Sequence, residues 1–237
     1  MRFDCASRTH VGLKRTANED AIYADPERGL WVVADGMGGH EAGEVASGMV
    51  IDAIRALPAV DDLDELTYSA NQALQQVNRD LIGLARSQGG GKSIGTTVVG
   101  LAVSGDAFRC FWIGDSRGYR LRDGEITRIT HDHSLVQNLV DAGMIKPEEA
   151  ETHENANLIT RAVGVAESVE VDIVSGEATA GDVFVLASDG VTRVVRDDEL
   201  ADELGRASPA EAADKIVEMV LARGAPDNLS LIIAKLV

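Results

Sequence analysis

The run WVVADGMGG places a carboxylate at the end of a strand that its neighbours mark as buried. Residues 31–34 are all apolar, and Asp35 follows them at once. An unpaired carboxylate in apolar surroundings is costly, and it takes up a proton rather than keep its charge. The chain must therefore fold so that something positive reaches Asp35.

The same arrangement recurs at three other places in the sequence. Asp115 follows the apolar stretch FWIG, Asp189 follows VFVLAS, and Asp227, followed by Asn228, stands just ahead of the apolar run LSLII. One such aspartate is as often a turn or N-cap residue as a functional one, but four of them need a common explanation. We expect the four strand ends to converge, and a hard divalent cation with oxygen ligands is the natural partner for convergent carboxylates.

Charge and cysteine content narrow the class of protein. The 237 residues hold 22 Lys and Arg against 39 Asp and Glu, a formal net charge of −17, which disfavours nucleic acid as a partner. Cys5 and Cys110 form no C-x-x-C pair, which argues against a disulfide framework and is typical of a reducing compartment. No segment has the roughly 20 apolar residues of a membrane span. We therefore expect one cytoplasmic, monomeric domain over residues 1–237.

The hydrophobic periodicity comes in blocks of helix and blocks of strand. Helical spacing is found at 42–57, 63–85, 197–204 and 209–223, and strand patterns at 94–129, 169–174, 183–187 and 229–236. Residues 130–165 form an irregular, partly helical excursion. Because the elements do not alternate strictly as βαβ units, the pattern favours an α+β fold with antiparallel sheet over a doubly wound one.

Two motifs suggest chemistry that their context does not support. GGGKSIGTT contains the end of a phosphate-binding loop, but Arg86 stands where the first glycine is required and a helix precedes the segment. His131 and His133 have a spacing that metal ligands can use. A histidine pair with no third partner nearby is more often structural, because such sites need three or four ligands.

Seven motifs in order resemble those of the metal-dependent serine/threonine protein phosphatases, the PPM or type 2C group. They are RTANEDA, VADGMGGHEAGEVAS, GTT, WIGDSRGYRLRDGEITRITHDHS, NLITRAVG, LASDGV and DNLSLII, and the resemblance covers essentially all of residues 2–237. The bacterial single-domain branch is the most similar. The resemblance implies a central β-sandwich of two antiparallel sheets flanked by helices on both sides. It also implies that about 130–165 is a flap beside the catalytic cleft.

The resemblance also assigns roles to individual residues. It implies two Mn²⁺ or Mg²⁺ ions, both bound by Asp35, with the Gly36 carbonyl on one of them. The remaining assignments are Asp189 and Asp227 on the other ion, Glu19 acting on metal-bound water, Asp20 close by, Asp115 with Asp189 at a possible third ion, and Arg15 on the phosphate. A guanidinium suits that role because its fork grips two phosphoryl oxygens at once.

One position departs from the family pattern. Many eukaryotic members carry a histidine where this chain has Met37, and that histidine is the usual candidate for protonating the leaving oxygen. His40 is a candidate replacement as general acid, and a metal-bound water is the alternative.

The implied activity is hydrolysis of phosphoserine and phosphothreonine in proteins by direct attack of a metal-bridging hydroxide, with no phosphoenzyme. Expected partners are phosphorylated proteins, including a cognate Ser/Thr kinase and its substrates. A catalytically silent pseudophosphatase that binds phosphoproteins is the alternative, and the retained acidic residues argue against it. A small-molecule phosphatase of the aspartyl-phosphate type is disfavoured, because Asp35 is not part of a D-x-D motif.

Overall fold

Two antiparallel sheets form the centre of the computed structural model, which describes residues 2–38, 42–60, 62–88, 93–150 and 152–237. The first sheet has the order β1 (Phe3–His10), β11 (Leu229–Leu236), β10 (Val183–Ala187), β7 (Arg117–Arg122) and β8 (Glu125–Arg128). The second has the order β2 (Asp20–Asp25), β3 (Leu30–Met37), β5 (Val98–Ser104), β6 (Ala107–Ile113) and β9 (Asp172–Glu177), with β4 (Gly95–Thr96) paired to the end of β3.

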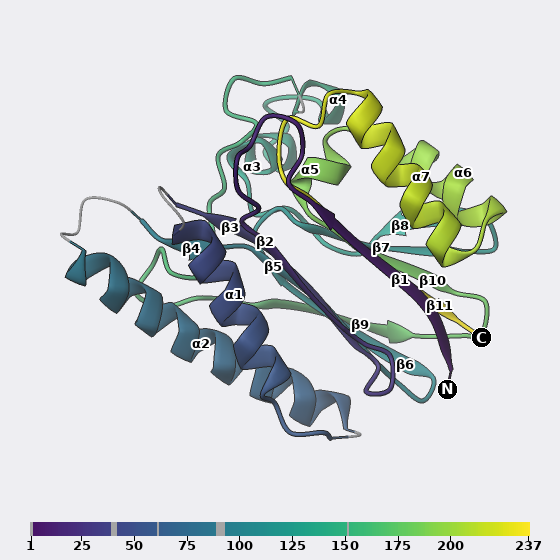
Figure 1. Cartoon of the computed structure of the whole chain (residues 1–237), viewed down its shortest axis with the longest axis horizontal. Helices are drawn as coiled ribbons and strands as arrows, with labels where there is room; N and C mark the ends of the chain where they lie inside the picture. Colours follow the sequence, from purple (N-terminus) through teal and green to yellow (C-terminus); the bar gives the residue numbers. More distant parts are fainter. Residues whose placement is uncertain (1, 39–41, 61, 89–92, 151) are drawn as a thin grey trace.

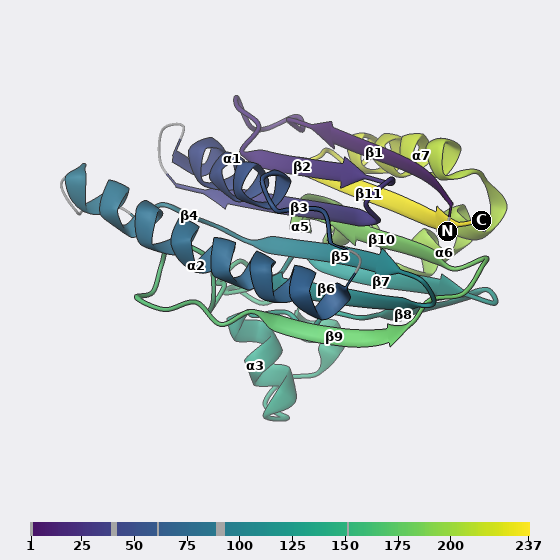
Figure 2. The ribbon, with the colours of Figure 1, turned by 90° about the horizontal axis from the view of Figure 1, so that it is seen from below.

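Helices cover the outer face of each sheet. The long helices α1 (Ala42–Arg55) and α2 (Leu63–Ser87) lie on the second sheet, whereas α6 (Asp197–Arg206) and α7 (Pro209–Ala222) lie on the first (Figures 1 and 2). The buried side chains of Trp31, Phe108 and Phe184 belong to the apolar layer between the sheets. The predicted α+β sandwich with flanking helices is therefore confirmed.

Local sequence explains where the helices begin. The side chain of Asp62 caps α2 by accepting hydrogen bonds from the backbone N–H groups of Asp64 and Glu65. Helix α7 begins with a capping box, in which Ser208 and Glu211 each accept from the other's backbone N–H, and Pro209 fills the first turn. Apolar residues at helical spacing then turn one face of each helix toward its sheet.

The sequence patterns missed or misplaced several edge elements. β1 and β2 were not among the expected strands, and both are edge strands whose half-exposed residues give no continuous apolar run. The strand expected at 169–174 is β9, three residues later in the chain. The Val169 carbonyl accepts a hydrogen bond from Gln75 of α2, so the chain at that point is tied to the helix rather than to the sheet.

The segment 130–165 is irregular with short helices, as its composition predicts. It contains α3 (Leu135–Asp141) and α4 (Pro147–Ala150), and an isolated bridge from Ser134 to Ile159 closes it on itself. A second bridge, from Thr96 to Val163, joins its end to the strand that follows α2. Within the residues that are described, no helix is long and apolar enough to cross a membrane.

Candidate functional site

A cleft of about 300 Å³ opens where strand ends of both sheets meet. Seven of the predicted site residues line it: Arg15, Glu19, Asp35, Gly36, Asp115, Asp189 and Asp227. The second sheet contributes the end of β3, and the first contributes the residues after β10 and before β11. His40, the candidate general acid, and residues 89–92 of the glycine-rich loop lie outside the described part of the chain.

Asp35 is held in place through its backbone. It faces Asp20 across the β2–β3 pair, its N–H donates to the Thr97 hydroxyl at 3.2 Å, and its carbonyl accepts from the Thr97 N–H at 2.8 Å. Thr97 in turn shares a hydroxyl contact of 2.8 Å with Ser116, the residue after Asp115. The backbone hydrogen bonds leave the Asp35 carboxylate free to face the cleft, and they connect it to the segment that carries Asp115.

Glycines let α1 approach the end of β3. A Cβ on Gly36 would lie 2.0 Å from the Gly43 carbonyl oxygen, and a Cβ on Gly43 would lie 2.5 Å from Oε1 of Glu19. No side chain fits at either position. The Gly43 N–H donates to Glu19 Oε1 at 3.2 Å, so the start of α1 fixes the Glu19 carboxylate beside the Gly36 backbone.

Asn228 is a positioning residue. It belongs to the motif DNLSLII, but the sequence pattern assigned it no role. Its amide nitrogen donates to the carbonyls of Val11 and Ala17 at 2.8 and 2.9 Å, and its amide oxygen accepts from the Glu19 N–H at 2.9 Å. These three bonds fold the segment between β1 and β2 against β11. That segment carries Arg15, whose Nη2 donates to Asp227 Oδ2 at 2.7 Å.

The electrostatics of the cleft are those of crowded carboxylates. Burial raises the pKa of Asp35 well above its usual range, and the charges of Asp20, Asp189 and Asp115 raise it further. Burial, with the charge of Asp189 adding to it, raises the pKa of Asp115 to about 6, although Arg193 opposes the shift. Burial and the mutual repulsion of the carboxylates therefore both disfavour the charged state of the set, and a bound cation would reverse this.

Asp20 gives the sharpest sign that a positive partner belongs here. Its Oδ2 accepts from the Ser188 hydroxyl at 2.9 Å, whereas its buried Oδ1 has no hydrogen-bond partner among the described residues. Burial raises the pKa of Asp20 to about 7, and Asp189 and Asp227 add to the shift. An orphaned carboxylate oxygen beside a cleft that is lined by five other carboxylates fits oxygen-ligand cations such as Mn²⁺ and Mg²⁺.

The carboxylates share the cleft without meeting at one point. In the described ranges, no three His, Cys, Asp or Glu side chains stand as close together as the ligands of one ion. Two arginines take up part of the charge instead: Arg15 contacts Asp227, and Arg193 contacts Asp115 at 2.8 Å and Asp189 at 3.0 Å. All four strand-end aspartates nevertheless line one cleft, in which Arg193 bridges Asp115 and Asp189 and Arg15 pairs with Asp227.

The two histidines of THDH serve the structure, as their spacing without a third partner suggested. His133 Nδ1 accepts from the Gly114 N–H at 3.0 Å, and the Gly114 carbonyl accepts from the His133 N–H at 2.9 Å. Gly114 has φ 108°, a conformation suited to glycine, and it directly precedes Asp115. Burial lowers the pKa of His133, so the neutral ring can keep this bond. His131 Nε2 contacts the exposed Asp141 at 2.7 Å.

Comparison with known families gives a match over nearly the whole chain. The family model described as Protein phosphatase 2C matches residues 9–230. The serine/threonine protein phosphatase PstP of Mycobacterium tuberculosis is 40% identical over 232 residues, which are 98% of this chain but 45% of PstP. The chain thus spans about half the length of that relative. The serine/threonine phosphatase stp of Listeria welshimeri is 34% identical, and the match covers 96% of this chain and 94% of stp.

Solved structures give the same result. PppA, a key regulatory component of T6SS in Pseudomonas aeruginosa, has a TM-score of 0.92 and 40% identity, covering 99% of this chain and 98% of PppA. The catalytic domain of PstP, solved in complex with two manganese ions, has a TM-score of 0.85 and 38% identity, covering 98% of this chain and 97% of that domain.

Proposed function

Because the chain belongs to the protein phosphatase 2C family, we propose that it is a Mn²⁺- or Mg²⁺-dependent phosphatase of phosphoserine and phosphothreonine in proteins. One observation carries the proposal: carboxylates from both sheets and the guanidinium of Arg15 line a single cleft. The solved PstP domain, 38% identical, holds two manganese ions. The crowded carboxylates of this cleft, with Asp20 and its orphaned oxygen paired across from Asp35, are a donor set of the right chemistry for such ions.

In this proposal the cleft residues divide into ion ligands and a phosphate-binding group. Asp35 would serve both ions, the Gly36 carbonyl and Glu19 would assist on one side, and Asp189 and Asp227 on the other. Two ions would supply an activated nucleophile and stabilise charge on the attacking and leaving oxygens.

The protein's own groups prepare the cleft for this chemistry. Arg15 is half exposed, so its guanidinium can grip phosphoryl oxygens with two parallel N–H groups. Asn228 holds the segment that carries Arg15 and Glu19, and Thr97 holds the backbone of Asp35. Such fixed positions lower the barrier because little reorganisation is needed when the substrate reacts.

The proposal is tested by turnover and binding together. We expect hydrolysis of p-nitrophenyl phosphate and of a phosphothreonine peptide with added Mn²⁺, loss of both with a chelator, and recovery when Mn²⁺ is restored. A pseudophosphatase would bind the phosphopeptide without turning over either substrate. An exposed carboxylate far from the strand ends, Asp52 on α1, offers a control, because Asp52→Asn should leave the rate unchanged.

The negative charge of the protein should affect which phosphopeptides it hydrolyses fastest. With a net charge of −17, the protein should associate faster with phosphopeptides that carry flanking lysines than with those that carry flanking glutamates. We expect kcat/KM to differ between two such peptides at low salt and the difference to shrink near 1 M salt, where the screening length is about 3 Å. A difference that persists at high salt would indicate direct contacts instead.

The proposal also covers the domain organisation, the cellular compartment and the substrates of the protein. We propose one catalytic domain, monomeric, with 130–165 as a flap beside the cleft, that acts in the cytoplasm on a cognate Ser/Thr kinase and its substrates. Cys5 and Cys110 are both free thiols, which supports a reducing compartment. Phosphoproteomic comparison of a deletion strain with its parent tests the choice of substrates.

A further inference from the structure

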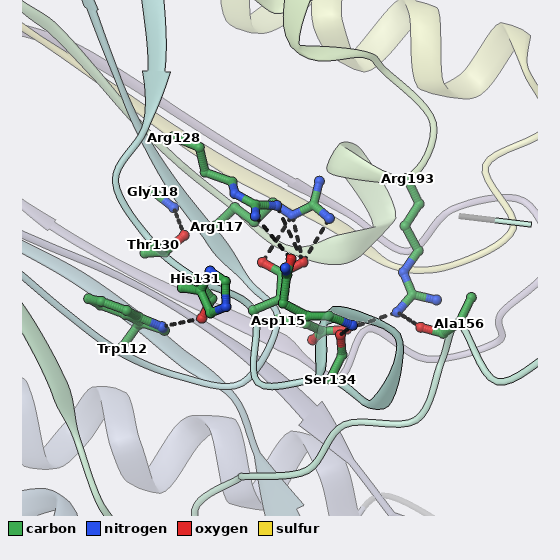
Figure 3. Close-up of polar contacts among 12 residues, drawn as sticks. Trp112, Asp115, Arg117, Gly118, Arg128, Thr130, His131, Ser134, Ala156 and Arg193 are labelled. Atoms are coloured by element: carbon green, nitrogen blue, oxygen red, sulfur yellow. Dashed lines mark hydrogen bonds and ion pairs between the residues drawn. The ribbon is translucent and has the colours of Figure 1, made fainter. Parts of the chain in front are cut away.

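The guanidinium of Arg193 touches three segments of the chain at once. Its Nη2 donates to Asp115 Oδ2 at 2.8 Å and to the Ala156 carbonyl at 3.0 Å, and its Nε lies 3.0 Å from Asp189 Oδ2. Figure 3 shows the arginine reaching from the end of α5 (Asp189–Thr192) toward Asp115 on one side and Ala156 on the other. One positive group therefore connects two strand-end carboxylates with the segment 152–158.

A second, smaller cavity shares these two carboxylates, those of Asp115 and Asp189, with the main cleft. It has a volume of about 50 Å³. Arg193 lines only the smaller cavity. A space of this size has room for a few water molecules, so the guanidinium can shift within it without forcing the backbone to move.

We infer that Arg193 competes with a divalent cation for Asp115 and Asp189, and that filling this site releases the segment 152–158. The inference rests on the two-ion centre proposed above and concerns a further, weaker cation at the edge of that centre. Arg193 acts on the cation site and on the flap; it is not assigned any contact with substrate.

Electrostatics set the direction of the competition. The guanidinium already neutralises part of the charge of Asp115 and Asp189, so a cation that approaches the same two carboxylates meets a positive charge beside them. It must then either bind weakly or displace the arginine. Both carboxylates use Oδ2 for Arg193, which leaves Oδ1 of each for the cleft. A cation can therefore begin to bind before the arginine has moved.

The contact with Ala156 connects cation binding to the flap. When Arg193 leaves the carboxylates, it also loses the position from which it bonds the Ala156 carbonyl. Coupling between two binding events is reciprocal, so an ordered segment 152–158 should weaken cation binding as much as the cation loosens the segment. Occupancy of the weakest cation site would then set how freely the flap opens over the cleft.

Calorimetric titration with Mn²⁺ tests the competition without measuring turnover. We expect Arg193→Gln to tighten the weakest Mn²⁺ site about tenfold, within the usual range for coupled sites, and to leave the tighter sites in place. Arg206→Gln is the matched control, because Arg206 is an exposed arginine paired with Asp202 on its own helix. It removes the same charge and should leave every Mn²⁺ affinity unchanged.

Hydrogen exchange of residues 152–158 tests the connection to the flap. In the wild-type protein, exchange should rise as the weakest site fills, and in Arg193→Gln it should be high at every Mn²⁺ concentration. The Arg193→Lys variant separates the effect of the positive charge from the effect of the contact with the Ala156 carbonyl. A lysine keeps the positive charge but cannot bridge three acceptors, so exchange should be high at every Mn²⁺ concentration while the weakest Mn²⁺ site tightens less than in Arg193→Gln.

The outcomes divide clearly. If Arg193→Gln leaves the affinity of the weakest Mn²⁺ site unchanged or lowers it, the competition is overturned. If hydrogen exchange of residues 152–158 in the wild-type protein does not change with Mn²⁺ concentration, the connection to the flap is overturned. Wild-type protein that binds no Mn²⁺ at all would overturn the proposed function as well, whereas normal binding with an unaffected variant overturns this inference alone. If Arg193→Gln does not fold, the exchange series on the wild type and Arg193→Lys decides the matter.

Discussion

At the scale of single residues, Asp35 shows how function opposes stability in this cleft. Burial raises its pKa well above the usual range, and Asp20, Asp189 and Asp115 repel its charge. Asparagine keeps the volume and removes the charge. We expect Asp35→Asn to abolish turnover of p-nitrophenyl phosphate and to stabilise the chelated protein by about 1 kcal/mol, a typical gain when a strained functional group is removed. Thermal unfolding in chelator checks this, and a destabilised variant would contradict it.

Arg15 allows a test of geometry against charge. Its Nη2 donates to Asp227 at 2.7 Å from a segment that Asn228 holds in place. Lysine keeps the charge but loses the planar fork. We expect Arg15→Lys to lower kcat/KM for a phosphopeptide about tenfold, nearly as much as Arg15→Ala, on the scale of one charge-assisted hydrogen bond. Steady-state kinetics measures this, and a lysine variant with wild-type kcat/KM would remove Arg15 from the phosphate site.

The strand-end aspartates could be predicted from the sequence because each motif is local. Asp35 and Asp189 directly follow or nearly follow the apolar runs that bury them, so a few adjacent letters carry the signal. Asn228 and Arg193 carry no such signal. Their partners lie far away in sequence, as with the Asn228 bond to the Val11 carbonyl and the Arg193 bond to Ala156, and only the folded chain brings them together.

At the scale of elements, the close approach of β3 and α1 builds one wall of the cleft. The carbonyl of Gly43 lies where a Cβ of Gly36 would be, and the Gly43 N–H holds Glu19. The first and last glycines of the DGMGGHEAG run, Gly36 and Gly43, are therefore required by the contact between a strand and a helix. The sequence identified α1 from its periodicity and β3 from its apolar run, but neither pattern could give the distance between them.

A pair of glycine substitutions in α1 tests this contact. A Cβ at Gly43 would meet Glu19 Oε1 at 2.5 Å, whereas a Cβ at Gly48 meets nothing within 4 Å. We expect Gly48→Ala to stabilise the protein by about 0.5–1 kcal/mol, because alanine is the better helix former, and to keep full activity. Gly43→Ala should lose most activity, because it displaces Glu19. Chemical denaturation and turnover of both variants measure this, and an active Gly43→Ala would show that Glu19 is dispensable.

Edge strands mark the limit of prediction at this scale. β9 lies three residues later than its pattern indicated, and its side chains alternate between half-buried and exposed without a run of apolar residues. Central strands such as β10 are buried throughout and were placed at their exact bounds. A strand can be recognised from the sequence most easily when both of its faces are buried, because its residues then form a continuous apolar run.

At the scale of the whole molecule, the cleft stands where two sheets bring like charges together. Burial and the nearby charges of Asp189 and Asp227 together raise the pKa of Asp20, which begins β2 of the second sheet, to about 7. A carboxyl group with a higher pKa in the folded state stabilises the fold in acid, and this contribution is lost as the pH rises through the folded value. Between about pH 4 and 7, the metal-free sandwich should therefore lose this contribution progressively.

Bound cations should reverse that trend, because they favour the ionised carboxylates. Mn²⁺ at about 100 times its dissociation constant adds about 2.7 kcal/mol to the stability of the fold. For a chain of this length that corresponds to a rise in Tm of about 5–10 °C. The rise should be larger at about pH 8 than at about pH 5.5, because protons compete with Mn²⁺ for Asp20, whose pKa is about 7, and Asp115, whose pKa is about 6. Thermal unfolding at both pH values, with Mn²⁺ and with chelator, measures the two increments. Asp35→Asn is the control, since it should shrink the increment at the higher pH, and equal increments in the wild type would mean that these carboxylates do not titrate together with ion binding.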